Sequence, residues 1–120
     1  ARFEEGVTLF NREKFFDAHE VWEGLWHEVR DTDRSFLQGL IQVAAALYHH
    51  QCDNLRGMAS QLQKAAGKLA RYPSTHRGVR NGRLLQDLQP WLAAAAEEGH
   101  SIPRTLSYPR ILTDESRSPS

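Results

Sequence analysis

The chain has 120 residues, enough for one domain around a single hydrophobic core, and its 40% hydrophobic and 25% charged residues are ordinary for a soluble globular protein. Fifteen basic residues balance fifteen acidic ones, so the chain as a whole has no electrostatic attraction to nucleic acids or anionic membranes. No apolar run approaches the roughly 20 residues that a transmembrane helix needs, so we expect no membrane partner.

Helical periodicity runs through almost the whole chain, and no stretch of alternating or β-branched residues indicates a strand. We predict a first helix over residues 3–13, a second over residues 15–30 and a third over residues 34–51. Asp33 is placed to cap the third helix. Because few positions of this helix are polar, we expect it to be the most buried element.

The second half of the chain predicts two more helices. Asn54 is a suitable N-cap for a fourth helix over residues 55–71, which has a clear apolar face. A fifth helix is expected over residues 82–98, where Pro90 should kink or split it and Gly99 should end it.

The residues from 102 to 120 predict an extended, partly disordered tail after a domain that covers residues 1–101. Three prolines and several serines give this segment its composition, and we expect the last seven or so residues to be disordered. Tyr108 and Ile111 are expected to pin the first half of the tail onto the domain. We therefore predict an all-α fold, a compact single-domain bundle of about five helices followed by the tail.

The second predicted helix carries an unusual density of acidic, histidine and tryptophan side chains. When its side chains are placed at 100° per residue, the tryptophans fall on the apolar face. His19, Glu23 and His27 form an i, i+4, i+8 row along the edge of that face, and Glu20 lies just beyond the row. The pattern therefore places polar groups, whose burial costs free energy, at the border of the core.

The third predicted helix has a matching polar row on an otherwise apolar surface, formed by Gln38, Gln42 and His49. A short connection should pack the two helices antiparallel, which brings the two rows to matching heights. We therefore predict a polar seam between these helices. It consists of His19, Glu23, His27, Gln38, Gln42 and His49.

Three interpretations of the polar seam stay open, because buried polar groups need partners, water or a ligand. The seam is a hydrogen-bond network that fixes helix register, or it is a small-ligand pocket in which His19, Glu20 and Glu23 are candidates for acid–base catalysis. A metal site is the third interpretation, with His19 and Glu23 as ligands completed by His27 or His49. The segment from His19 to Glu23 resembles part of a zinc protease helix, but it is an HExxE motif that lacks the second histidine. No particular cofactor is implied.

A basic cluster spans the exposed face of the fourth predicted helix and the loop that follows it. It comprises Lys64, Lys68, Arg71, His76, Arg77, Arg80 and Arg83. A solvated face is the ordinary interpretation, and binding to a nucleic acid or an acidic partner is the alternative. Aromatic residues are almost absent from the cluster, so we do not expect nucleic-acid binding.

Self-association and location can also be addressed from the sequence. The apolar face of the fifth helix is where we expect a homo-oligomer contact, if the chain forms one. That face carries Leu84, Leu88, Trp91 and Leu92. Cys52 is the single cysteine and no signal peptide is visible, so an intrachain disulfide is excluded and a cytoplasmic location is expected.

Two motifs together resemble a known family. One is Phe-Asp-Ala-His-Glu-Val-Trp-Glu-x-x-Trp at residues 16–26, and the other is Phe-Leu-Gln-Gly-Leu-Ile-Gln-Val-Ala-Ala-Ala-Leu-Tyr-His at residues 36–49, followed by Asn-Leu-Arg-Gly at residues 54–57. They are similar to the domain-of-unknown-function family 309, small bacterial and archaeal proteins, over residues 3–72 and more weakly over the fifth helix. The resemblance implies a compact helical bundle and no established reaction. The motif positions map onto His19, Glu20, Glu23, Trp26, Gln38, Gln42 and His49.

Overall fold

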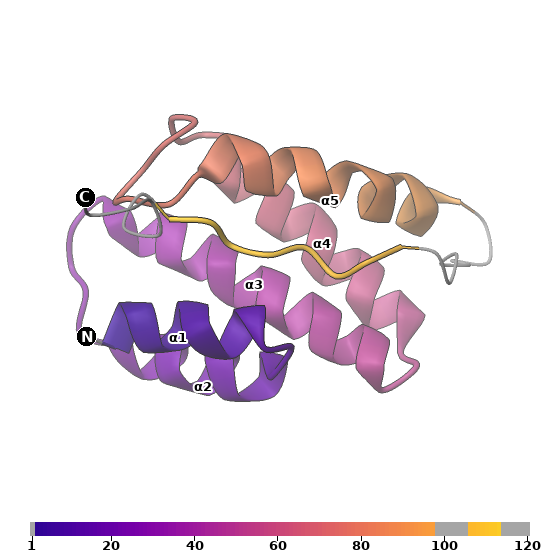
Figure 1. The fold of residues 1–120 in the computed structure, drawn as a ribbon, viewed down its shortest axis with the longest axis horizontal. Coiled ribbons are helices and arrows are strands. Elements are labelled where there is room, and N and C mark those ends of the chain that lie inside the picture. The colour runs from indigo at the N-terminus through magenta and orange to yellow at the C-terminus, as the bar shows by residue number, and fades with distance from the viewer. Residues whose placement is uncertain (1, 98–105, 114–120) are drawn as a thin grey trace, which may run out of the picture.

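A computed structural model describes residues 2–97 and 106–113. These residues contain five helices and no strand. The helices are α1 (Arg2–Asn11), α2 (Phe15–Trp26), α3 (Asp33–Gln51), α4 (Leu55–Leu69) and α5 (Asn81–Ala96). In Figure 1, α3 runs through the middle of the molecule, with the α1–α2 pair on one side and the α4–α5 pair on the other. The predicted all-α bundle is therefore confirmed.

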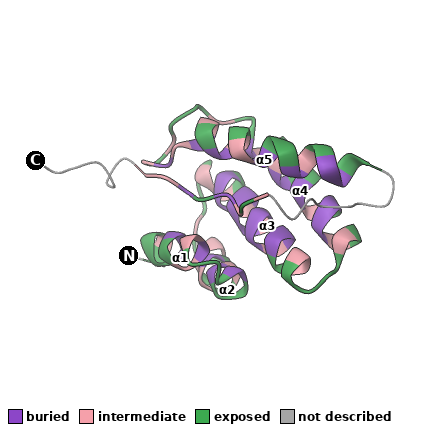
Figure 2. Ribbon diagram, turned by 45° about the vertical axis from the view of Figure 1, so that its right-hand side comes forward, coloured by how far each residue is buried: buried purple, intermediate pink, exposed green. Residues whose placement is uncertain are grey.

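The central position of α3 explains its sequence. It packs against both α2 and α4, so a single apolar stripe would not be enough to cover its buried surface. The residues that it buries are Phe36, Leu37, Gly39, Leu40, Ile41, Val43, Ala44, Ala46 and Leu47. Figure 2 shows this burial along most of the helix.

The α1–α2 pair is held by close contact around Trp22, whose side chain is fully buried. A Cβ atom added at Gly6 of α1 would lie 2.1 Å from Trp22 Nε1, so only glycine permits this approach. The indole N–H of Trp22 donates a hydrogen bond to the Phe3 carbonyl at 3.1 Å. At the other end of the pair, the rings of Phe10 and Phe15 meet edge to face at 5.0 Å.

The predicted bounds of α2 were wrong at its C-terminus, since the helix ends at Trp26 and not at residue 30. Its last turn tightens, with the Glu28 N–H bonded to the Leu25 carbonyl at 2.9 Å. The Arg30 guanidinium donates to the His27 carbonyl at 2.7 Å and so satisfies an acceptor that the helix leaves open. Because the helix ends at Trp26, His27 lies past its end, and it is exposed.

The start of α3 also differs from the prediction. The helix begins at Asp33, and Thr32 occupies the cap position without a side-chain cap bond. Asp33 does not cap the helix, because its carboxylate binds His76 and Arg77 from the loop before α5. The first helix likewise ends at Asn11 and not at residue 13.

The second half of the bundle follows the predicted elements closely. The Asn54 side chain accepts the Gly57 N–H at 3.0 Å, so the predicted cap of α4 is confirmed. The helix α5 continues across Pro90, which is exposed, so the predicted split does not occur. An exposed proline is tolerated because water can bond the carbonyl that loses its partner. The predicted stop at Gly99 lies outside the described residues.

Residues 106–113, here called the strap, lie extended along the bundle (Figure 1). Ile111 is buried, and the Asn11 side chain bonds both its N–H (2.7 Å) and its carbonyl (2.9 Å). Tyr108 stacks on Trp91 at 5.4 Å, and its hydroxyl lies 2.6 Å from His50 Nδ1. Pinning of the tail by Tyr108 and Ile111 is thus confirmed. The boundary predicted at residue 101 and the disorder predicted at the C-terminus fall outside the described residues.

Candidate functional site

A cavity of about 200 Å³ opens between α2 and α3, and we call it the α2–α3 cavity. Its lining residues are Phe16 and His19 from α2 and Ala45, Tyr48 and His49 from α3. The antiparallel packing of the two helices places the start of α2 beside the end of α3, which is why these residues meet. Two histidines of the polar seam, His19 and His49, therefore share one cavity.

Two aromatic side chains of the cavity lining are exposed to solvent. Phe16 is 47% exposed and Tyr48 is 37% exposed, and they are the large hydrophobic residues that stay exposed in the part of the chain that the structure describes. Their ring centroids are 5.1 Å apart, and Phe16 also stacks on the His19 imidazole at 6.3 Å. Exposure of apolar side chains of this size to water is energetically unfavourable. Their pairing beside a cavity is therefore typical of a binding surface.

His19 lies between two carboxylates of its own helix. Its Nδ1 is 3.4 Å from Glu20 Oε2, and its Nε2 is 3.5 Å from Glu23 Oε2. Nδ1 is buried and has no hydrogen-bond partner. An imidazole between two carboxylates can take or give a proton, so the arrangement is suited to proton transfer and to binding a polar group.

The side chain of His49 has a defined tautomer when neutral. The Asn54 side-chain oxygen, Oδ1, accepts a hydrogen bond from the Gly57 N–H, and this bond orients the amide group. The amide nitrogen of Asn54 therefore faces His49 and lies 3.2 Å from its Nδ1. An amide N–H donates, so Nδ1 accepts and the ring proton belongs on Nε2. The cap of α4 thus sets the hydrogen-bonding character of a residue that lines the cavity.

The other residues of the polar seam are not brought to the cavity. Gln38 and Gln42 are half-buried on α3 but do not line it, and His27 is exposed beyond the end of α2. Gln42 Oε1 is buried without a hydrogen-bond partner. Such an acceptor costs about 1–3 kcal/mol unless water or another group bonds it. Since Glu23 is 48% exposed, the seam also reaches solvent.

The metal interpretation has little geometric support. Within residues 2–97 and 106–113, no group of three or more His, Cys, Asp or Glu side chains is placed to hold a metal ion. His19 and Glu23 are adjacent, but His49 does not join them as a third ligand.

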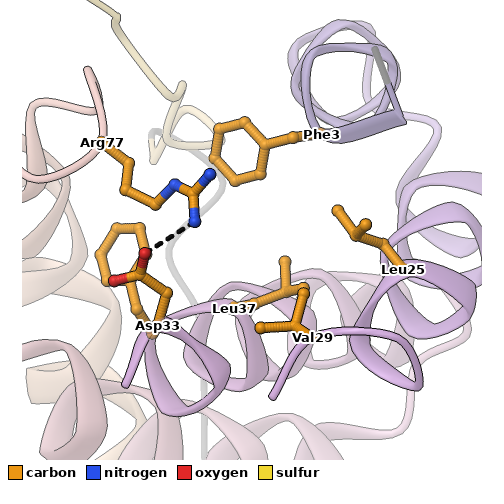
Figure 3. A pocket seen from close by; sticks show the side chains of 7 residues that line it. Phe3, Leu25, Val29, Asp33, Leu37 and Arg77 are labelled. Atoms are coloured by element: carbon orange, nitrogen blue, oxygen red, sulfur yellow. Dashed lines mark hydrogen bonds and ion pairs between the residues drawn. The ribbon is translucent and has the colours of Figure 1, made fainter. Parts of the chain in front are cut away.

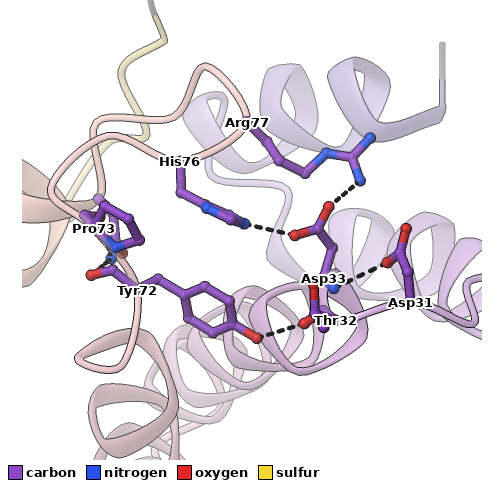
Figure 4. Close-up of polar contacts among 8 residues, drawn as sticks. Asp31, Thr32, Asp33, Tyr72, Pro73, His76 and Arg77 are labelled. Atoms are coloured by element: carbon purple, nitrogen blue, oxygen red, sulfur yellow. Dashed lines mark hydrogen bonds and ion pairs between the residues drawn. The ribbon is translucent and has the colours of Figure 1, made fainter.

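A second polar cluster was not predicted. The Asp33 carboxylate lies 2.6 Å from His76 Nε2 and 2.6 Å from an Arg77 guanidinium nitrogen, and Tyr72 donates to the Thr32 carbonyl at 2.7 Å (Figure 4). Burial alone would raise the pKa of Asp33, but the hydrogen bonds from His76 and Arg77 outweigh it and lower that pKa. No local pattern could reveal contacts between residues more than forty positions apart.

A small cavity of about 70 Å³ lies beside this cluster. Figure 3 shows Phe3, Leu25, Val29 and Leu37 around it, with Arg77 and Asp33 on one side. Because the two charges neutralise each other and the cluster joins the loop before α5 to the start of α3, its evident role is structural.

The predicted self-association face of α5 and the basic cluster are less available for binding in the structure than the sequence indicates. Leu84, Leu88 and Trp91 of α5 are buried within the chain, so these side chains are not exposed for self-association. In the basic cluster, Arg77 pairs with Asp33 and Arg83 with Asp87 (3.1 Å), which removes part of its charge. None of the helices in residues 2–97 and 106–113 has both the length and the apolarity needed to cross a bilayer.

Comparison with known proteins agrees with the sequence motifs. Residues 3–61, which form α1 to α3 and part of α4, match the family described as "Domain of unknown function (DUF309)". The Bacillus subtilis (strain 168) protein described as "Uncharacterized protein YpuF" is 36% identical over 81 residues, which is 62% of this chain and 45% of that protein. The chain thus spans less than half the length of this curated relative. The family resemblance is therefore confirmed, and residues 3–61 of the chain match the DUF309 family.

Proposed function

We propose that the chain binds a small molecule in the α2–α3 cavity. The observation that carries the proposal is the pairing of Phe16 and Tyr48, two exposed aromatic residues of a cavity whose lining also includes His19 and His49. Ligand sites commonly combine an apolar wall with a few polar groups that fix orientation. A volume of about 200 Å³ suits a compact ligand or one group of a larger one.

The polar groups of the cavity would orient such a ligand. His19 Nδ1 is buried and has no hydrogen-bond partner, and His49 presents a ring whose tautomer is fixed by Asn54. The pair of His19 with Glu20 or Glu23 also gives the site the means for proton transfer to a bound molecule.

Binding can be tested by titration with benzyl alcohol, benzylamine and phenylacetate, which share one ring and differ in charge. We expect at least one probe to shift the side-chain NMR signals of Phe16, His19 and Tyr48 saturably, with a Kd on the order of 1 mM for so few atoms. Replacement of Ala45 by leucine should fill the cavity and weaken binding about tenfold or more. Ala93→Leu, an exposed site on α5, is the matched control and should bind normally.

Two results would contradict this function. In the first, none of the three probes shifts the cavity signals saturably. In the second, Ala45→Leu and Ala93→Leu bind the probes as the unaltered chain does.

Self-association is a second candidate function, favoured by the same two exposed side chains. Phe16 and Tyr48 form an aromatic patch that a second copy of the chain could cover. Light scattering over increasing protein concentration would then show a dimer that Phe16→Ala weakens. A monomer at every concentration would exclude this candidate.

A further inference from the structure

We propose that the ligand of the α2–α3 cavity is a small organic cation, a protonated amine or quaternary ammonium group on an apolar body. The inference rests on the proposed small-molecule binding and adds the chemical class of the ligand. Three features of the site favour a positive charge: the aromatic faces, the carboxylates beside them and the absence of a competing cation in the wall.

The aromatic faces are the first feature. Phe16 and Tyr48 have ring centroids 5.1 Å apart and both are partly open to solvent. A cation within about 6 Å of an aromatic centroid is attracted by the negative face of the ring. A ligand between these two rings can therefore place an ammonium group against aromatic carbon while its apolar body fills the cavity.

Two carboxylates lie on the same face of α2 as Phe16. Glu20 and Glu23 follow Phe16 at i+4 and i+7, so the three side chains share one helix face. Their Oε2 atoms lie 3.4 and 3.5 Å from the ring of His19, which itself lines the cavity. Both carboxylates are about half exposed, and both lie beside His19, a residue of the cavity lining.

The remaining charges do not reverse this preference. Neither lysine nor arginine is among the described residues that line the cavity. The N-terminus of α2 and the C-terminus of α3 meet there, and their opposite partial charges offset each other. Even when His19 is protonated, its single positive charge is smaller than the two negative charges of Glu20 and Glu23, so the group keeps one net negative charge.

The benzyl probes separate charge from shape. Benzylamine is protonated at neutral pH, benzyl alcohol has nearly the same shape without charge, and phenylacetate carries the opposite charge. We expect benzylamine to bind about five- to twentyfold more tightly than benzyl alcohol, and phenylacetate to bind most weakly. Added salt should weaken the binding of benzylamine and leave that of benzyl alcohol nearly unchanged.

Two substitutions test the two sources of attraction. Glu20→Gln should weaken the binding of benzylamine about two- to threefold without affecting that of benzyl alcohol. Glu97→Gln, which removes the same charge from the exposed residue just after α5, should change neither. Phe16→Leu keeps an apolar side chain but removes the ring face, and it should weaken benzylamine about threefold more than benzyl alcohol.

The outcomes distinguish this inference from the function on which it rests. If benzyl alcohol or phenylacetate binds the cavity as tightly as benzylamine does, the preference for a cation is wrong and small-molecule binding stands. If benzylamine binds equally to the Glu20→Gln and Phe16→Leu variants and to the unaltered chain, the preference is also wrong. If no probe binds at the cavity, both proposals fail.

Discussion

Replacement of Gly6 by alanine should destabilise the fold, because α1 approaches the indole of Trp22 more closely than a Cβ atom allows. The added atom would lie 2.1 Å from Trp22 Nε1 and 2.4 Å from Cε2. Such a contact must be relieved by moving a fully buried side chain, and overpacking of a core costs about 1–3 kcal/mol.

The same movement would lengthen or break the hydrogen bond from Trp22 to the Phe3 carbonyl, which contributes about 1 kcal/mol to stability. Alanine is intrinsically better than glycine inside a helix by about 1 kcal/mol, which offsets part of the loss. We therefore expect the free energy of unfolding to fall by about 1–3 kcal/mol.

Gly67→Ala is the matched control for this experiment. Gly67 also lies inside a helix, but a Cβ atom added there meets nothing within 4 Å. Only the helix propensity changes, so the chain should become more stable by about 0.5–1 kcal/mol. Urea unfolding followed by circular dichroism measures both variants, and their difference isolates the steric effect at Trp22. Equal stabilities of the two variants would refute the close packing of α1 on α2.

Two further predictions concern pH. The pKa of Asp33 is below its ordinary value of 3.8, so its contacts with His76 and Arg77 stabilise the fold above that pH. This stabilisation is lost as the pH falls through the folded-state pKa. Asp33→Asn should be less stable at neutral pH and should flatten the decline of stability in acid, and an unchanged acid profile in urea unfolding would contradict this. Burial lowers the pKa of His50 from 6.5, so stability should decline as the pH falls from about 6.5 through the folded-state value, because the unfolded chain binds the proton first. His50→Gln should remove that part of the decline, and a variant with the profile of the unaltered chain would show that the buried imidazole does not contribute.

Much of the fold could be predicted because its signals are local. The near-continuous apolar sequence of α3 indicates a helix covered on several sides, and Asn54 is a cap whose partner lies three residues away. The end of α2, where the Arg30 side chain bonds the His27 carbonyl, was harder to predict. The pattern of side chains there remains compatible with several more helical residues.

The candidate site divides in the same way. The proximity of His19 and Glu23 follows from their i, i+4 spacing, and the antiparallel pairing of α2 and α3 was enough to bring His49 near His19. The exposure of Tyr48 depends on which helices cover α3 at that point, and no local pattern contains this information. The contact of Asp33 with His76 joins residues 43 positions apart, and a single sequence holds no sign of it.

The strap has a consequence for the order in which the molecule folds. Most of the bundle is stabilised by helices that are neighbours in sequence, whose contacts close short loops and form quickly. The bonds between Asn11 and Ile111 instead join residues 100 positions apart, close to the full length of the chain. Closing that loop costs conformational entropy before the two hydrogen bonds can form. The surface onto which the strap docks also consists of residues from three different helices. The cost of closing this long loop favours assembly of the helices before the strap docks onto them.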